Sequence, residues 1–115
     1  MKFIFIYNAN SGKLNALLDG VHKLLSPKTY PCSLCALTYD AFSEKKTWKN
    51  FREKSNTDLI FYHKDEFEAI FPNVKVEYPS VLKLMDNQLT TILNNEKLNS
   101  IQSVEELIEI LKNRF

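Results

Sequence analysis

The chain has 115 residues, of which 44% are hydrophobic and 25% are charged, and its formal net charge is +1. This length suits one domain, and the near-neutral charge gives no strong field to attract nucleic acid or an anionic membrane. The two glycines, Gly12 and Gly20, are too few for a dinucleotide-binding loop or a complete P-loop. The first apolar run ends at Asn8, too early for a signal sequence or a membrane span. We therefore expect a cytoplasmic protein without nucleic-acid or membrane partners.

The first half of the chain predicts two buried strands, with a long helix after the first. Residues 2–7 (KFIFIY) and 58–63 (DLIFYH) are apolar on both faces, as in strands that helices cover on both sides. Asn10 or Ser11 is expected to cap the helix, and Ser26-Pro27 to end it. The apolar residues of this helix recur at helical spacing and should face the core: Leu14, Leu17, Leu18, Val21, Leu24 and Leu25.

A variable segment separates this helix from the second strand. We interpret residues 27–57 as an irregular insert within a single domain of residues 1–115. One helical turn is expected from Cys32 or Ser33, and a polar surface helix from a Ser43 cap to about Lys54. The aromatic residues of the insert should either pack it onto the sheet or form a binding surface. They are Tyr30, Tyr39, Phe42, Trp48 and Phe51.

The second half of the chain predicts a short helix, a hairpin and a terminal helix. Asp65 with Glu68 is expected to cap the short helix, which should end at Phe71-Pro72. The further elements are strands over residues 81–85 and 88–93 joined by the turn Asp86-Asn87, a polar loop, and a helix that begins with the capping box Ser103–Glu106.

The order of these elements resembles the thioredoxin fold. The run VKVEYPSVLKLMDNQLTTIL, a loop, and SVEELIEILKNR are similar to the ending of that fold, where an X-Pro bond precedes a hairpin and a terminal amphipathic helix. The resemblance implies an α/β protein with a single mixed sheet of about four strands (β-α-[insert helix]-β-α-β-β-α) and helices on both faces. It also implies that the bond before Pro79 is cis and that Tyr78 and Pro79 contact substrate. The sequence departs from the family at residues 8–13, because the family's Cys-x-x-Cys follows the first strand and no cysteine occurs there.

Cys32 and Cys35 are the only cysteines, and they form a Cys-x-x-Cys pair. In a reducing compartment, such a pair is more often redox-active or metal-binding than a structural disulfide. If a helical turn begins at Ser33, its dipole would favour a Cys32 thiolate as the attacking sulfur, and Cys35 would resolve the mixed disulfide. A zinc site would need His22 and His63 as well. Two thiols that serve only as packing are the remaining interpretation.

The segment Asn8-Ala9-Asn10-Ser11-Gly12-Lys13 is interpreted either as a weak anion site or as an ordinary capped start of a helix. A Walker A motif fails at two fixed positions, because Tyr7 replaces the first glycine and Leu14 replaces the metal-binding hydroxyl residue. The string YNANSGKLNALLDGVHKLLSP also resembles small uncharacterised bacterial proteins that are sometimes labelled GTPases. The candidate anion-binding residues are Asn10, Ser11, Gly12 and Lys13.

These patterns support one leading hypothesis and two rivals. The leading hypothesis is a thiol–disulfide or redox-sensing protein, in which Cys32 and Cys35 react with protein thiols or small thiols, without a cofactor or a metal. The first rival is a non-enzymatic interaction module whose cysteines are structural. The second rival is a weak phosphate or nucleotide binder at the helix start of residues 8–13.

Overall fold

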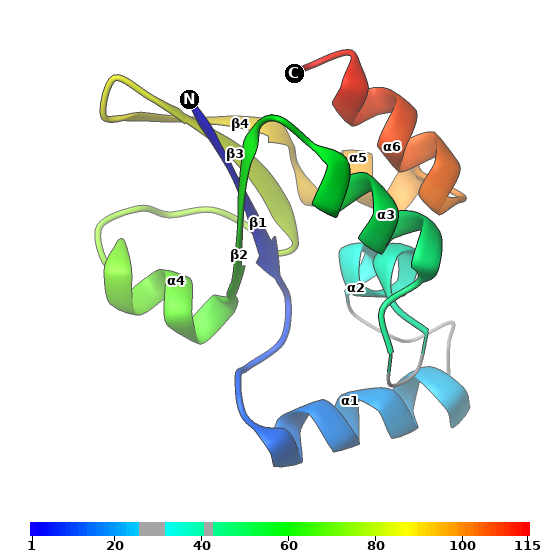
Figure 1. Ribbon diagram of the computed structural model, residues 1–115. Helices are drawn as coiled ribbons and strands as arrows, with labels where there is room; N and C mark the ends of the chain where they lie inside the picture. Colours follow the sequence, from blue (N-terminus) through cyan, green and yellow to red (C-terminus); the bar gives the residue numbers. More distant parts are fainter. Residues whose placement is uncertain (26–31, 41–42) are drawn as a thin grey trace.

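The computed structural model describes residues 1–25, 32–40 and 43–115 as an α/β arrangement around one mixed sheet (Figure 1). The described strands pair in the order β2-β1-β3-β4. Strands β1 (Lys2–Tyr7) and β2 (Asp58–His63) are parallel, with Lys2 opposite Asp58 and Tyr7 opposite His63. Strands β3 (Ser80–Met85) and β4 (Gln88–Leu93) extend the sheet in antiparallel pairing. The predicted strand positions are therefore confirmed, with β3 beginning one residue early.

The helices differ from the predictions more than the strands do, both in their number and in their positions. Ser103 is the N-cap of the terminal helix, as predicted, and its hydroxyl accepts a hydrogen bond from the Glu106 amide at 3.1 Å. A helix at residues 95–100 replaces part of the expected polar loop, and Asn94 caps it. The described helices are α1 (Lys13–Leu25), α2 (Ser33–Thr38), α3 (Lys46–Lys54), α4 (Lys64–Ile70), α5 (Asn95–Ser100) and α6 (Val104–Lys112).

Two of the predicted helix caps are wrong. Lys45 rather than Ser43 precedes α3, and its side chain makes no capping bond. His63 rather than Asp65 caps α4, in a capping box with Glu66. In both cases, more than one polar residue lies near the helix start, and the sequence alone does not decide which one adopts the extended backbone of a cap.

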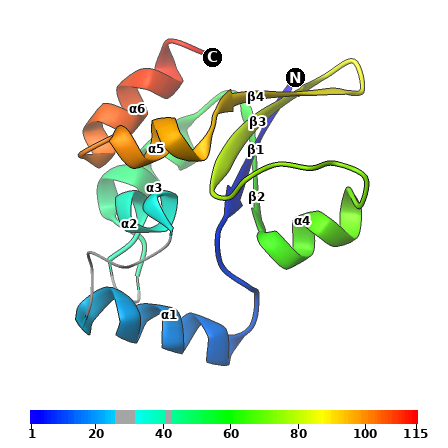
Figure 2. The same ribbon diagram turned by 180° about the vertical axis from the view of Figure 1, so that it is seen from behind.

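The sheet separates two apolar clusters, because side chains alternate between the faces of a strand. On β1, Phe3, Phe5 and Tyr7 belong to the larger cluster, whereas Ile4 and Ile6 belong to the smaller one. Helices α2, α3, α5 and α6 lie on the face of the larger cluster, and α4 lies on the other face (Figures 1 and 2). Both faces of the central strand are therefore covered, as its uninterrupted apolar sequence predicted.

Four apolar side chains of helix α1 are exposed, which corrects the expectation that they face the core. Leu18, Val21, Leu24 and Leu25 are 58%, 39%, 63% and 79% exposed. The side chains of Leu14 and Leu17 lie outside the described part of the structure. In both views, α1 lies beyond the end of β1 and apart from the other layers (Figures 1 and 2). Helical periodicity indicates that one face is apolar, but it does not indicate what covers that face. The first helix along the chain that packs in the core is α2.

Part of the proposed insert lies outside the described residues. The structure does not describe residues 26–31 and 41–42, and Tyr30 and Phe42 are among them. Of the other aromatic residues of the insert, Trp48 is buried, while Tyr39 and Phe51 pack against the larger cluster. In the described part of the insert, Tyr39, Trp48 and Phe51 therefore pack the insert onto the sheet, as expected.

Trp48 offers a test of this packing. It is fully buried, and its ring lies 5.7 Å from the ring of Phe5 and 5.4 Å from that of Phe51. We expect Trp48→Ala to lower the free energy of unfolding by about 3–5 kcal/mol, because a large buried side chain is lost. Trp48→Phe is the matched control, since the indole N–H has no hydrogen-bond partner among the described residues. Denaturant unfolding should show less than half the loss for the control, and equal losses would contradict this account.

Candidate functional site

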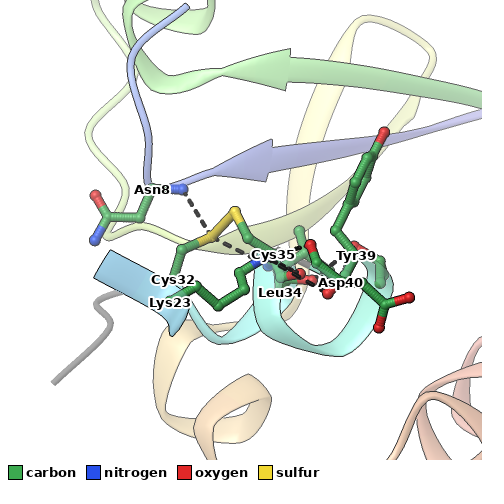
Figure 3. Close-up of a disulfide and its surroundings, with 8 residues drawn as sticks. Asn8, Lys23, Cys32, Leu34, Cys35, Tyr39 and Asp40 are labelled. Carbon is green, nitrogen blue, oxygen red and sulfur yellow. Dashed lines mark hydrogen bonds between the residues drawn. A yellow bond between two sulfur atoms is a disulfide. The ribbon is translucent and has the colours of Figure 1, made fainter. Parts of the chain in front are cut away.

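The two cysteines form a disulfide, with their Cα atoms 5.2 Å apart (Figure 3). Cys32 is the N-cap of α2, and Cys35 lies in the first turn of this helix. The predicted helical turn after Cys32 is therefore confirmed. A Cys-x-x-Cys pair at a helix start brings both sulfurs together because residues three apart lie on the same face of a helix.

Backbone hydrogen bonds hold the Cys32 sulfur from two sides. The Cys35 amide lies 3.2 Å from Cys32 Sγ and donates to it, as a helix amide does to a capping side chain. The Asn8 amide donates to the same sulfur at 3.3 Å, across 24 positions of sequence (Figure 3). Asn8 directly follows β1, so this bond fixes the start of α2 at the carboxyl end of the central parallel pair. Functional groups of parallel sheets gather at this end.

The disulfide is enclosed. Cys32 has no exposed surface and Cys35 is 7% exposed, and both belong to the larger apolar cluster. The redox hypothesis requires an incoming thiol to reach one of the sulfurs. In this oxidised state, Cys35 is the more accessible residue of the pair.

Lys23 of α1 closes the other end of α2. Its ammonium lies 3.3 Å from the carbonyl oxygen of Cys35, 3.5 Å from that of Tyr39 and 3.3 Å from that of Asp40 (Figure 3). The last carbonyls of a helix lack intrahelical partners, and a cation there is favoured by the helix dipole. Lys23 therefore holds α1 against α2 although Leu18, Leu24 and Leu25 of α1 are exposed.

Two tyrosines lie on the same side of the sheet as the disulfide. Burial, followed by the neighbouring Tyr39, raises the pKa of Tyr7 far above its usual value. Burial likewise raises the pKa of Tyr39. Beside them, Arg52 donates two hydrogen bonds to the Glu44 carboxylate, at 2.9 Å from Nε and 2.6 Å from Nη2. Both phenols therefore stay protonated at neutral pH, and neither supplies a base for a thiol.

Tyr78 and Pro79 precede β3, and the bond between them is cis. The first residue of β3, Ser80, pairs with Ile6 near the end of β1. Pro79 is buried and Tyr78 is half-buried. Burial raises the pKa of Tyr78, with a smaller contribution from Glu68. Both residues thus lie at the end of the sheet where β1 ends, and their contact with a substrate stays a prediction.

At the predicted anion site, the protein supplies its own carboxylate. Asp65 of α4 accepts from the Ser11 amide at 3.0 Å and from the Ser11 hydroxyl at 2.6 Å. Gly12 has φ of 113°, a left-handed conformation that glycine adopts without steric cost. Asn10 is exposed, and the side chain of Lys13 lies outside the described part of the structure. Binding of an external phosphate here stays a prediction, and it would have to compete with Asp65.

The two histidines are not joined to the cysteines in a metal site in the described structure. Among residues 1–25, 32–40 and 43–115, no three His, Cys, Asp or Glu residues are grouped to hold a metal ion. The His63 Nδ1 atom lies 2.8 Å from the Glu66 carboxylate, within the cap of α4. In the same part of the chain, no helix is long and apolar enough to span a membrane.

Comparisons with models of known protein families, with curated proteins and with solved structures found no match to this chain. The site is thus defined by its own geometry. Two of its features had no signal in the sequence: the bond from Asn8 to the Cys32 sulfur and the contacts of Lys23. Both join residues far apart in sequence, and both use backbone atoms that every residue carries.

The contact between Ser11 and Asp65 predicts a pH effect on stability. The Ser11 hydroxyl and amide bonds hold the pKa of Asp65 below its usual value. The contact therefore stabilises the fold above the ordinary aspartate pKa, and this stabilisation is lost as the pH falls through the lowered value. We expect Asp65→Asn to lower the urea midpoint at pH 7 and to differ less from the wild type near pH 3. The control Asp86→Asn, an exposed turn residue, should show no such convergence, and a pH-independent Asp65→Asn effect would contradict this interpretation.

Proposed function

We propose that this protein is a thiol–disulfide protein of thioredoxin-like fold, in which the Cys32–Cys35 pair alternates between disulfide and dithiol. One observation carries the proposal: the disulfide begins a helix and is hydrogen-bonded to the backbone at the end of the central strand. A helix start with amide donors favours a thiolate, and this lowers the barrier to exchange.

The fold supports this interpretation. A parallel pair, β1 and β2, is followed by an antiparallel hairpin, β3 and β4, and by the terminal helix α6. The cis bond at Tyr78–Pro79 agrees with the resemblance that the sequence of this half suggests.

The displaced position of the cysteines also has an explanation. The family resemblance places Cys-x-x-Cys between the first core strand and the next helix. In this chain, Cys32 lies 24 positions after Asn8, the residue that follows β1. Helix α1 lies apart from the sheet, whereas α2 begins beside Asn8 (Figures 1 and 3). If α1 is an addition to the fold, then α2 is the helix of the first unit, and the cysteines have the family's position.

The exchange reaction that we propose is balanced in two steps. A thiolate attacks the Cys35 sulfur, forms a mixed disulfide with it and breaks the internal bond, and the electron pair passes to the Cys32 sulfur. A second thiol then attacks the outer sulfur of the mixed disulfide and releases Cys35, which takes up a proton. Two external thiols are thereby oxidised to one disulfide, while the protein pair is reduced.

The unequal exposure of the two cysteine residues supports attack at Cys35 rather than at Cys32, the reverse of the roles that the sequence suggested. Cys35 is 7% exposed, whereas Cys32 has no exposed surface. Cys32 is also the better leaving group, because the Asn8 and Cys35 amides already donate to its sulfur.

Titration of the protein in a series of glutathione redox buffers tests the function. We expect a single measurable midpoint for the pair, because exchange in the folded protein connects it to the glutathione pool. Quenching with a thiol-alkylating reagent and mass spectrometry would count the reduced sulfurs. A pair that stays wholly oxidised or wholly reduced across the series would contradict the proposal.

Single-cysteine variants test the order of attack. Cys32→Ser leaves the thiol of the more exposed residue, Cys35, and Cys35→Ser leaves that of the fully buried Cys32. Each variant is the matched control for the other. We expect Cys32→Ser to form a mixed disulfide with glutathione disulfide several-fold faster, because its thiol is the more accessible one. The opposite order would restore Cys32 as the attacking sulfur.

A structural disulfide is the second candidate, and the enclosure of both sulfurs favours it. Closing so short a loop stabilises the fold by about 2 kcal/mol in the chain-entropy model. Under this alternative, a phosphine reductant lowers the free energy of unfolding by about that amount. Under the same alternative, the folded protein would not exchange with glutathione, so the rate of exchange distinguishes the two candidates.

A further inference from the structure

We propose that the groove between α3 and α6 binds an acidic segment of a partner polypeptide that carries a bulky apolar side chain. The groove has a volume of about 520 Å³ and opens to solvent. It is lined by α3, by the turn at residues 55–57 and by α6 with the residues after it. Helices α3 and α6 lie side by side in both views (Figures 1 and 2).

The floor of the groove is apolar and rests on the core. Phe51, Ile108 and Phe115 line it and are only partly buried. The rings of Phe51 and Phe115 are stacked, with centroids 5.9 Å apart, and Phe115 also lies 4.6 Å from the ring of Phe3. Since Phe3 is fully buried, the floor is held in place by the core. A preformed apolar floor favours an apolar side chain of the partner, because little ordering is needed on binding.

The rim of the groove is positively charged. Lys54 and Lys112 line it, and the described lining residues include no aspartate or glutamate. The nearby Glu53 carboxylate pairs with Lys49 at 3.9 Å rather than with Lys54. In the described residues, neither Lys54 nor Lys112 forms an ion pair. Two ammonium groups beside an apolar floor are complementary to carboxylates that flank an apolar side chain.

The shape of the groove favours a polypeptide over a small molecule. Small-ligand sites usually enclose most of the ligand surface, whereas this groove is open to solvent. Asn50 and Asn56 also line it, and their side-chain amides offer hydrogen-bond partners for a peptide backbone. The Ser55 hydroxyl already bonds the backbone of Thr57. An extended chain can lie in an open groove and place one side chain on the floor.

The groove and the disulfide lie at opposite ends of the parallel strand pair. The groove reaches Thr57, which precedes Asp58, and Asp58 pairs with Lys2 at the start of β1. The disulfide contacts Asn8, past the other end of β1. The peptide site is therefore independent of thiol exchange, and failure of either proposal leaves the other standing.

Fluorescence anisotropy with a labelled peptide, Glu-Glu-Phe-Glu-Glu, tests the groove in the full chain. Lys54→Gln with Lys112→Gln should weaken binding roughly three- to tenfold, the effect of losing two exposed charge pairs. The control, Lys75→Gln with Lys83→Gln, makes the same change in net charge outside the groove lining, and it should change the affinity less than twofold. A peptide with alanine in place of phenylalanine should bind more weakly to the wild type, because the floor then lacks its apolar partner.

Amide chemical shifts during the same titration locate the site. Changes centred on α3, residues 55–57 and α6 would support the proposal. Equal weakening by the two double variants, equal binding of the alanine peptide, shifts centred elsewhere, or no binding at millimolar peptide would each overturn it. Oxidised and reduced protein should bind the peptide equally.

Discussion

The hydrogen bond from the Asn8 amide to the Cys32 sulfur is the contact on which the functional interpretation depends. It joins the first residue after β1 to the N-cap residue of α2, across 24 positions of sequence. It places the pair at the carboxyl end of the central strands, the end of the sheet at which Ser80, the residue after the cis Tyr78–Pro79 bond, pairs with Ile6. Tyr78 itself packs against the smaller cluster, on the other face of the sheet. The Asn8 amide thus links the cysteine pair to the end of the central strand.

The same contact explains why α1 and α2 have such different surroundings. Once the start of α2 is fixed beside β1, Leu34 and Leu37 enter the larger apolar cluster together with both cysteines. Lys23 holds α1 near α2 through carbonyl oxygens at the end of that helix, so a polar contact positions a helix whose described leucine side chains are exposed.

The strands could be predicted from the sequence because each carries its evidence locally. The run KFIFIY places apolar residues on both faces of β1. Asp86 and Asn87 adopt the positive φ values that their turn requires, 52° and 64°. The caps were less predictable, as His63 and Lys45 show, because several neighbouring residues suit the same role. The surroundings of α1 could not be predicted, since the apolar pattern of a helix does not indicate whether that helix packs on the sheet. The cysteine pair was visible in the sequence, but its place beside Asn8 was not, because a backbone amide leaves no trace in residue type.

The disulfide is enclosed, and the account therefore requires that the region around α2 change when the pair is reduced while the sheet persists. Two-dimensional amide NMR of the protein, recorded across a redox titration, tests this requirement most directly. The account predicts that the Asn8 and Cys35 amide signals shift at the midpoint of thiol formation, whereas signals of Phe3 and Phe5 in the centre of β1 keep their positions. Asn8 and Cys35 signals that do not respond to reduction of the pair would contradict the account, because the Cys32 sulfur would then not be the acceptor that holds α2 to β1.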